Sequence, residues 1–314
     1  LQQKTYLDKT WNQKSEIRQV GILEAMNFRL DASYQLDANN SIGANFGFLR
    51  NPKQTWNGDM SSLILQDEDL SESSDSHADF FWQKNNLSSN IYYVGKIGKL
   101  SIDFNTDWLW SKEYQNDVTK EQYQEVGMDA QSQTAHSLTN KDYHLLASKL
   151  VLSYPLLGGN LSLGGEYSNT HRTSKYQVVP TNLVSDDDSR ITESMTSSFL
   201  TYSRDFGNLS LEAGLRYEYI DFNYYEYGKY VPGQSKSYGN WFPSLSLSMP
   251  VGKVQMQLSY AADINRPSYQ NLRSGIQYDN RYTYETGNPF LVSEISKNLN
   301  YELAYKWLTF DMTY

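Results

Sequence analysis

The chain has 314 residues, no cysteine, a net charge of −9 and a mean hydropathy of −0.65. No apolar run approaches the roughly 18 residues of a membrane-spanning helix, which excludes a helical transporter. The excess of 36 Asp and Glu over 27 Lys and Arg argues against a nucleic-acid partner, and the lack of cysteine excludes disulfide scaffolds and thiolate metal sites.

Apolar residues recur with a period of two along most of the chain, which is typical of strands with two different faces. The clearest case is 209–221, where Leu211, Leu215 and Tyr219 alternate with polar residues such as Glu212. No segment of ten or more residues carries a helical stripe. In chain order, strands are predicted around 26–36, 42–48, 100–110, 146–154, 161–167, 209–221, 245–249, 254–264, 299–305 and 308–314.

The connections between these segments alternate between short and long. Short turns, most containing Gly or Asn, are predicted at 37–40, 96–99, 157–160, 205–208, 250–253 and 306–307. Long polar loops are predicted near 50–86, 112–141, 177–190, 223–239 and 265–294. This alternation is typical of an up-and-down antiparallel sheet, with short turns facing the periplasm and long loops facing outward.

Strand length distinguishes a membrane barrel from a soluble protein. Soluble strands usually have about 5 to 6 residues, whereas the strands expected here approach about 11 to 13, which suits a tilted membrane strand. A barrel of about 14 strands cannot fill its interior with side chains, so its apolar face must point toward lipid. We therefore predict an all-β, antiparallel up-and-down transmembrane β-barrel in the bacterial outer membrane. The alternative is a large soluble β-sandwich or propeller whose apolar faces pack on each other.

The barrel interpretation assigns a place to many side chains. Aromatic residues at strand ends are candidates for interfacial girdles: Tyr154, Tyr202, Tyr217, Tyr219, Trp108, Trp110 and Trp307. Polar residues on the opposite face would line a wet lumen of mixed charge: Arg29, Asp31, Asp103, Asn105, Glu212, Arg216 and Glu218. Neither set indicates a particular ligand.

A sequence motif lies between Tyr260 and Tyr305. It begins with Ile264-Asn265-Arg266-Pro267-Ser268-Tyr269-Gln270-Asn271-Leu272 and continues with Tyr278, Asp279, Tyr282, Thr283, Tyr284, Gly287-Asn288-Pro289 and Leu291. This stretch resembles the C-terminal barrel region of Bacteroidetes-type TonB-dependent receptors, although the family commonly has a basic residue and Pro where Val292-Ser293 stands here. We expect structural roles for Arg266, Pro267, Tyr269, Leu272, Gly287, Asn288 and Pro289, because a fixed-φ Pro at a strand exit usually shapes a loop.

The resemblance implies an outer-membrane transporter with a barrel of about 22 strands and an N-terminal plug inside it. It also implies uptake of a large solute, such as a siderophore, vitamin B12, a glycan or a peptide, powered through a TonB partner. No plug or signal peptide is recognisable, so we expect residues 1–314 to form a single β-barrel domain that is a fragment of a larger receptor. The alternative is a complete stand-alone barrel that acts as a binding or adhesion scaffold.

Signals for catalysis or for a cofactor are weak. The four histidines have no metal-ligand spacing, and no nucleophile or phosphate-binding motif occurs, so we expect no enzyme, catalytic residue, metal site or cofactor. Two acidic clusters could offer oxygen ligands to Ca²⁺, but acidic loops are more often simply solvated. These clusters are Asp67-Glu68-Asp69 with Glu72, Asp75 and Asp79, and Asp186-Asp187-Asp188.

One aromatic cluster follows the strand at 209–221. Tyr224, Tyr225, Tyr227 and Tyr230 could form an outer recognition surface, because Tyr offers a flat apolar face with a polar tip. Such a surface would suit a carbohydrate or a surface lipoprotein. The alternative is that these rings pack against the barrel girdle and their own loop.

Overall fold

The computed structural model describes residues 2–6 and 9–314, and most of these form strands. In this described part, no helix is long and apolar enough to cross a membrane. The strands are β1 (Gln2–Tyr6), β2 (Lys9–Leu23), β3 (Met26–Asp37), β4 (Asn40–Gln66), β5 (Asp69–Ile97), β6 (Leu100–Glu125), β7 (Gln131–Leu156), β8 (Gly159–Val179), β9 (Asp187–Phe206), β10 (Leu209–Glu226), β11 (Lys229–Tyr230), β12 (Lys236–Val251), β13 (Val254–Asn265), β14 (Ile276–Asn280), β15 (Thr283–Thr286), β16 (Glu294–Tyr305) and β17 (Leu308–Thr313).

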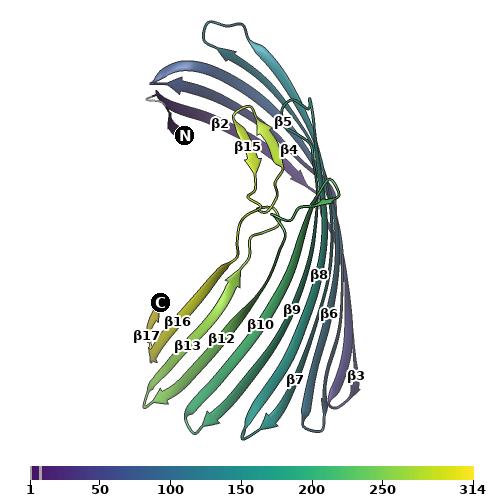
Figure 1. Ribbon diagram of the computed structural model, residues 1–314, viewed down its shortest axis with the longest axis vertical. Coiled ribbons are helices and arrows are strands. Elements are labelled where there is room, and N and C mark those ends of the chain that lie inside the picture. The colour runs from purple at the N-terminus through teal and green to yellow at the C-terminus, as the bar shows by residue number, and fades with distance from the viewer. Residues whose placement is uncertain (1, 7–8) are drawn as a thin grey trace.

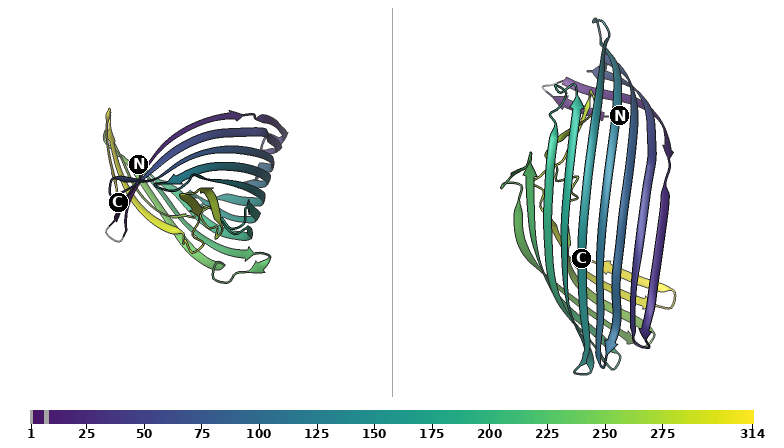
Figure 2. Two further views of the ribbon diagram at one scale, coloured as in Figure 1. Left: turned by 90° about the horizontal axis from the view of Figure 1, so that it is seen from above. Right: turned by 90° about the vertical axis from the view of Figure 1, so that its right-hand side faces the viewer.

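One antiparallel sheet contains all of these strands except β14 and β15. Its order is β1-β2-β4-β5-β6-β7-β8-β9-β10-β12-β13-β16-β17, with β3 paired to β4 and β11 paired to β10. Most strands therefore lie beside their neighbours in sequence, which is the up-and-down topology that the alternating turns predicted. The sheet curves into a tall wall with a concave inner side, and its first and last strands do not pair (Figures 1 and 2).

All six predicted short turns are confirmed, and they lie together at one end of the wall, which we call the turn end. Their geometry explains the glycines, because tight hairpin turns need residues with positive φ. Gly98, Gly158, Gly207 and Gly252 have φ of 61, 75, 65 and 64°. Lys306 supplies a positive φ of 52° without glycine.

The predicted long loops near 50–86 and 112–141 are wrong. Strands β4 and β5 continue for 27 and 29 residues and meet at a tight turn, Asp67-Glu68, while β6 and β7 each have 26 residues. The period of two fades beyond the apolar band because polar side chains lie on both faces, yet the backbone ladder continues. The end opposite the turn end, which we call the loop end, therefore projects far beyond the length that lipid requires.

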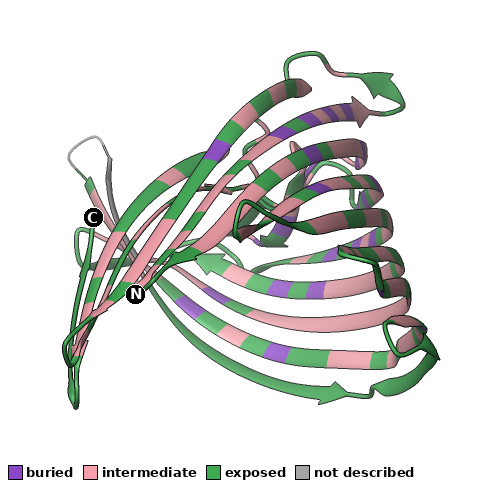
Figure 3. Cartoon of the chain, turned by 90° about the horizontal axis from the view of Figure 1, so that it is seen from below, coloured by how far each residue is buried: buried purple, intermediate pink, exposed green. Residues whose placement is uncertain are grey.

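The two faces of the wall differ near the turn end, as predicted. Outward positions are apolar and exposed; on β10 these include Leu215 and Tyr219, while Arg216 and Glu218 point inward. Figure 3 shows exposed and intermediate residues along this region of the sheet and few buried ones. Other outward apolar side chains are Phe104, Leu150, Leu163, Leu200, Leu245, Leu258 and Leu299. This outward band is the surface that faces lipid.

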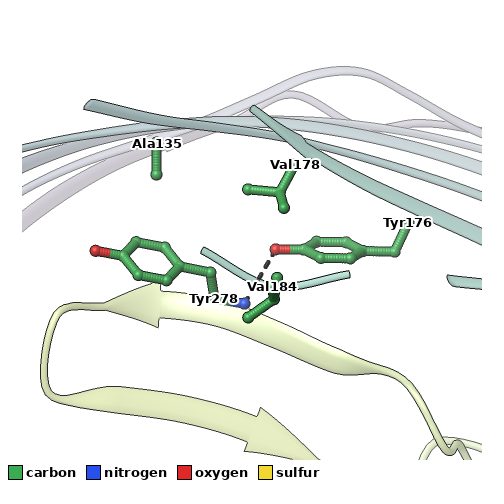
Figure 4. Packing of buried hydrophobic residues seen from close by; sticks show 5 residues of the cluster. All are labelled: Ala135, Tyr176, Val178, Val184 and Tyr278. Carbon is green, nitrogen blue, oxygen red and sulfur yellow. Dashed lines mark hydrogen bonds between the residues drawn. The ribbon is translucent and has the colours of Figure 1, made fainter. Parts of the chain in front are cut away.

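The buried core is small and lies at the loop end, where a connection between strands folds against the inner side of the wall. One cluster joins Ala135, Tyr176, Val178 and Val184 to Tyr278 of β14, as Figure 4 shows. A second cluster contains Ile191, Ile220, Phe222, Tyr224 and Leu272. Inward positions thus change from polar in the lower wall to apolar where the connection covers them.

Candidate functional site

The candidate site is formed by residues 266–293, which connect β13 to β16 and which we call the inner segment. It includes the β14–β15 hairpin and lies inside the concave side of the wall (Figure 1). The long connection predicted at 265–294 is therefore present, but it folds inward and contacts strands β5 to β10 and β12. The sequence motif thus lies at the mouth of the lumen.

The motif residues give the inner segment its shape. After Pro267, the backbone N–H of Asn271 donates to the backbone carbonyl of Ser268 over 2.9 Å. The backbone N–H of Asn288 donates to the backbone carbonyl of Asn271 over 2.7 Å. A Cβ on Gly287 would lie 2.6 Å from that same carbonyl oxygen, so the close approach requires glycine. These contacts close the base of the hairpin.

The base of the inner segment is anchored mainly by apolar packing. Leu272 is 4% exposed and contacts the cluster that contains Ile220 and Tyr224. The Tyr269 hydroxyl donates to Glu193 Oε1 over 3.0 Å, and burial raises the pKa of Tyr269, so this phenol stays protonated. The hydroxyls of Tyr224 and Ser274 are hydrogen-bonded over 2.9 Å.

An ion pair fixes the start of the segment. Arg266 contacts the carboxylate of Glu218, whose side chain is only 3% exposed, and the guanidinium of Arg216 lies 3.6 Å from the same carboxylate. Glu218 was predicted to line a wet lumen. It does point inward, but it is buried because the inner segment covers it.

The tip of the segment is anchored by polar groups. The amide of Arg281 donates to Glu121 Oε1 over 2.7 Å, and the Tyr278 hydroxyl also contacts Glu121. Glu72 Oε1 accepts from Arg281 Nε over 2.8 Å and from the Tyr282 hydroxyl over 2.7 Å. Two glutamates of the wall therefore hold the hairpin across the lumen mouth.

One carboxyl under the hairpin titrates near neutral pH. Asp117 lies on the inner face of β6, beyond the lipid-facing band, and burial raises its pKa to about 7, with a further contribution from Asp279 of the inner segment. Gln115 and Lys141 face the same carboxyl and oppose the shift. Burial beneath the inner segment favours the protonated form of Asp117. The resulting stabilisation of the docked segment is fully present below pH 3.8, the ordinary pKa of this carboxyl, and is lost as the pH rises through about 7.

We therefore expect the urea midpoint of segment release to fall between pH 4 and pH 7, and Asp117→Asn to reduce that fall. The measurement is protease cleavage within 266–293 at several urea concentrations and pH values. Asp103→Asn, a change on the inner face near the turn end of the same strand, is the control and should keep the pH dependence of the parent chain. Identical pH profiles for the parent chain and Asp117→Asn would contradict the assignment.

The four predicted recognition tyrosines do not form one surface. Tyr224 is 1% exposed and points inward, whereas Tyr227 and Tyr230 are exposed by 57% and 50%. Tyr225 contacts Tyr230 edge to face, with ring centroids 5.6 Å apart. The Arg190 guanidinium lies 4.1 Å from the centre of the Tyr225 ring. The other three rings therefore remain candidates for a surface at the loop end.

The acidic clusters are divided between the two sides of the wall. Within the Asp67–Asp79 stretch, Glu72 points inward to Arg281, whereas Asp79 points outward and lies 3.3 Å from His77. Asp187 is buried, and the neighbouring Asp188 pairs with Lys175 over 3.0 Å. Across residues 2–6 and 9–314, no group of three or more His, Asp or Glu side chains is placed to hold a metal ion.

Sequence reasoning missed the carboxylates that anchor the hairpin. Glu72 was noted only as part of an acidic loop, and Glu121 was not singled out, since it lies 160 residues from the backbone amide that it binds. The available signal was alternation along the strand. If 112–125 had been read as a continuing strand, Asp117 and Glu121 would have been placed on the lumen face together with Asp103.

Comparison with known proteins agrees with this geometry. A sequence model of the outer membrane protein beta-barrel family matches residues 94–314, whereas no curated protein matches the chain. The copper transporter OprC superposes with a TM-score of 0.55 at 10% identity, covering 94% of this chain and 51% of that one. A mutant ferric enterobactin receptor, PfeA, of Pseudomonas aeruginosa gives 0.50 at 15% identity, covering 97% and 52%.

These similarities define the fold and its setting. The chain spans about half the length of the solved structures it matches. At this identity the likeness concerns the fold, and it confirms the predicted resemblance to the barrels of outer-membrane receptors. The family match covers well over half of the chain and confirms the predicted location in the bacterial outer membrane. The chain belongs to the outer membrane protein beta-barrel family.

Proposed function

We propose that this barrel is part of a TonB-dependent receptor that imports a large solute across the outer membrane. The observation that carries the proposal is the inner segment, which lies across the mouth of a polar lumen and is tied to the wall at both base and tip. A protein that only displays binding loops needs no such constriction. The similar structures are a copper transporter and a ferric enterobactin receptor, and they support the same proposal.

The receptor acts, in this proposal, together with a plug inside the barrel and TonB in the inner membrane. The test compares the source bacterium with two deletions, one of this gene and one of tonB, during uptake of labelled glycans, peptides, ferric siderophores and cobalamin. Loss of the same solute in both deletions is the expected result. Unchanged uptake in the gene deletion, with reduced adherence to surfaces, would instead identify a binding or adhesion scaffold.

We propose further that Tyr225, Tyr227 and Tyr230 help to capture the solute or a surface lipoprotein. Replacing the three by Ser is expected to weaken capture by about two- to tenfold for each ring that stacks, because such contacts contribute about 0.5 to 1.5 kcal/mol. The measurement is uptake by cells that carry the complete receptor. Tyr167→Ser, a change of an exposed tyrosine on the outward face of β8, is the control and should leave capture intact. Unchanged uptake by a folded triple variant would remove these rings from the capture site.

A further inference from the structure

Glu72 and Glu125 are directly opposite each other on neighbouring strands of the wall. They are paired in the β5–β6 register, and both side chains reach Arg281 on the inner side. Like charges at directly opposite positions destabilise an antiparallel pair. The wall therefore presents two carboxylates that require a cation between them, and the wall itself does not supply it.

The cation comes from the tip of the inner segment. Arg281 Nε lies 2.8 Å from Glu72 Oε1, and its Nη2 lies 3.7 Å from Glu125 Oε1. Its Cζ lies 3.7 Å from the centre of the Tyr123 ring, which belongs to the same strand as Glu125. Two carboxylates and an aromatic face suit a planar, weakly hydrated guanidinium better than a compact ammonium. We call Glu72, Tyr123 and Glu125 the acid cage.

The acid cage is open to solvent and its occupant is on a separate element. The side chains of Arg281 and Glu125 are 28% and 49% exposed, although that of Glu72 is only 13% exposed. Apolar packing holds the inner segment at two places, at its base around Leu272 and at Tyr278 of β14. Beyond Tyr278, the turn that carries Arg281 is held by polar contacts to Glu72 and Glu121, and it can therefore move while the base stays bound.

We propose that the acid cage is a recognition subsite for the guanidinium group of an incoming solute, such as an arginine-containing peptide, and that Arg281 is its built-in occupant. An arriving guanidinium replaces Arg281 with the same contacts, so the exchange leaves the two carboxylates neutralised throughout. The displaced hairpin then uncovers the lumen mouth. This inference rests on the proposed import function, since it names the chemical class that is imported.

The first experiment uses the complete chain in detergent, with N-acetyl-arginine amide as the probe and calorimetry as the measurement. Arg281→Ala is expected to bind the probe about tenfold or more tightly than the parent chain, because it lacks the tethered competitor. The corresponding citrulline amide, which has the same shape but no charge, should not bind. The lysine amide should bind more weakly than the arginine amide.

A double variant, Arg281→Ala with Glu125→Gln, should lose the binding that Arg281→Ala gains. Lys229→Ala, a change of the exposed first residue of β11, serves as the control and should behave like the parent chain. Absence of probe binding to folded Arg281→Ala, equal binding of the citrulline amide, or retention of binding by the double variant would each overturn the proposal. Heat-modifiable migration on gels verifies that each variant is folded.

A second measurement leaves the acid cage intact. The chain has no cysteine, so Thr283→Cys places a single spin label at the exposed tip of the hairpin. The arginine amide should increase the mobility of this label, and the citrulline amide should not; an unchanged spectrum at saturating probe would overturn the proposal. Binding and displacement without uptake in cells would reject the import function and leave the subsite established, so the two failures are distinguishable.

Discussion

Replacing Glu218 by Ala is expected to lower the free energy of unfolding by about 3 kcal/mol, the lower end of the range for breaking a buried ion pair. The side chain of Glu218 is 3% exposed and contacts Arg266, with Arg216 also within 3.6 Å. Removing the carboxylate leaves two guanidinium groups facing each other at the start of the inner segment. Because the side chain of Arg266 is still 30% exposed, water offsets part of the loss.

The measurement for Glu218→Ala is urea unfolding in lipid vesicles, followed by tryptophan fluorescence. Glu212→Ala is a matched control, since Glu212 lies on the same strand and face but is exposed. Its effect should remain below about 0.5 kcal/mol. Equal effects of the two substitutions would show that the ion pair contributes nothing beyond a surface charge.

The part of the fold governed by local rules could be predicted from the sequence. Turns at the turn end follow from glycine at positions that need positive φ, as at Gly207 and Gly252. The outward apolar face follows from the period of two, as at Leu215 on β10. These signals are strong because lipid on one side and water on the other impose opposite chemistry on adjacent residues.

The length of β4 and β5 at the loop end could not be predicted, because polar residues occur on both faces of this pair. In the β4–β5 pair, Ser62 points inward and His77 points outward, so alternation in polarity is lost while hydrogen bonding continues. Ending the predicted strand at Asp221 had a further consequence. It placed Tyr224 in an outer loop, although unbroken alternation with Glu218 assigns it to the inner face, where it is buried.

The anchoring of the inner segment lay beyond any local signal. Arg281 and Glu72 are 209 residues apart, and their meeting depends on the curvature of the whole wall. The motif from Arg266 to Pro289 was recognisable in the sequence, and its residues were expected to shape a loop. The sequence did not show whether this loop folds into the barrel or away from it, since both courses use the same turn residues. The buried Leu272 is the clearest mark of the inward course.

Replacing Leu272 by Ala is expected to release the inner segment while the barrel wall remains folded. Leu272 is 4% exposed and packs on Ile191, Ile220, Phe222 and Tyr224, and removing a buried leucine side chain of this kind costs about 2 to 5 kcal/mol. The strands of the wall keep their backbone hydrogen bonds on both sides of this contact. The substitution therefore weakens the docking of the inner segment and leaves the wall folded.

The measurement for Leu272→Ala is limited proteolysis, with cleavage expected within 266–293 at protease concentrations that leave the parent chain intact. Heat-modifiable migration on gels should be unchanged, because it reports the wall. Val292→Ala is the matched control, since Val292 is 77% exposed near the end of the same segment and contributes little packing. Protection equal to that of the parent chain would show that the remaining contacts, those of Tyr278, Arg266, Glu72 and Glu121, hold the segment without Leu272. Simultaneous loss of heat-modifiable migration would show that wall and segment unfold as one unit, because the apolar cluster beneath Leu272 would then be needed by both.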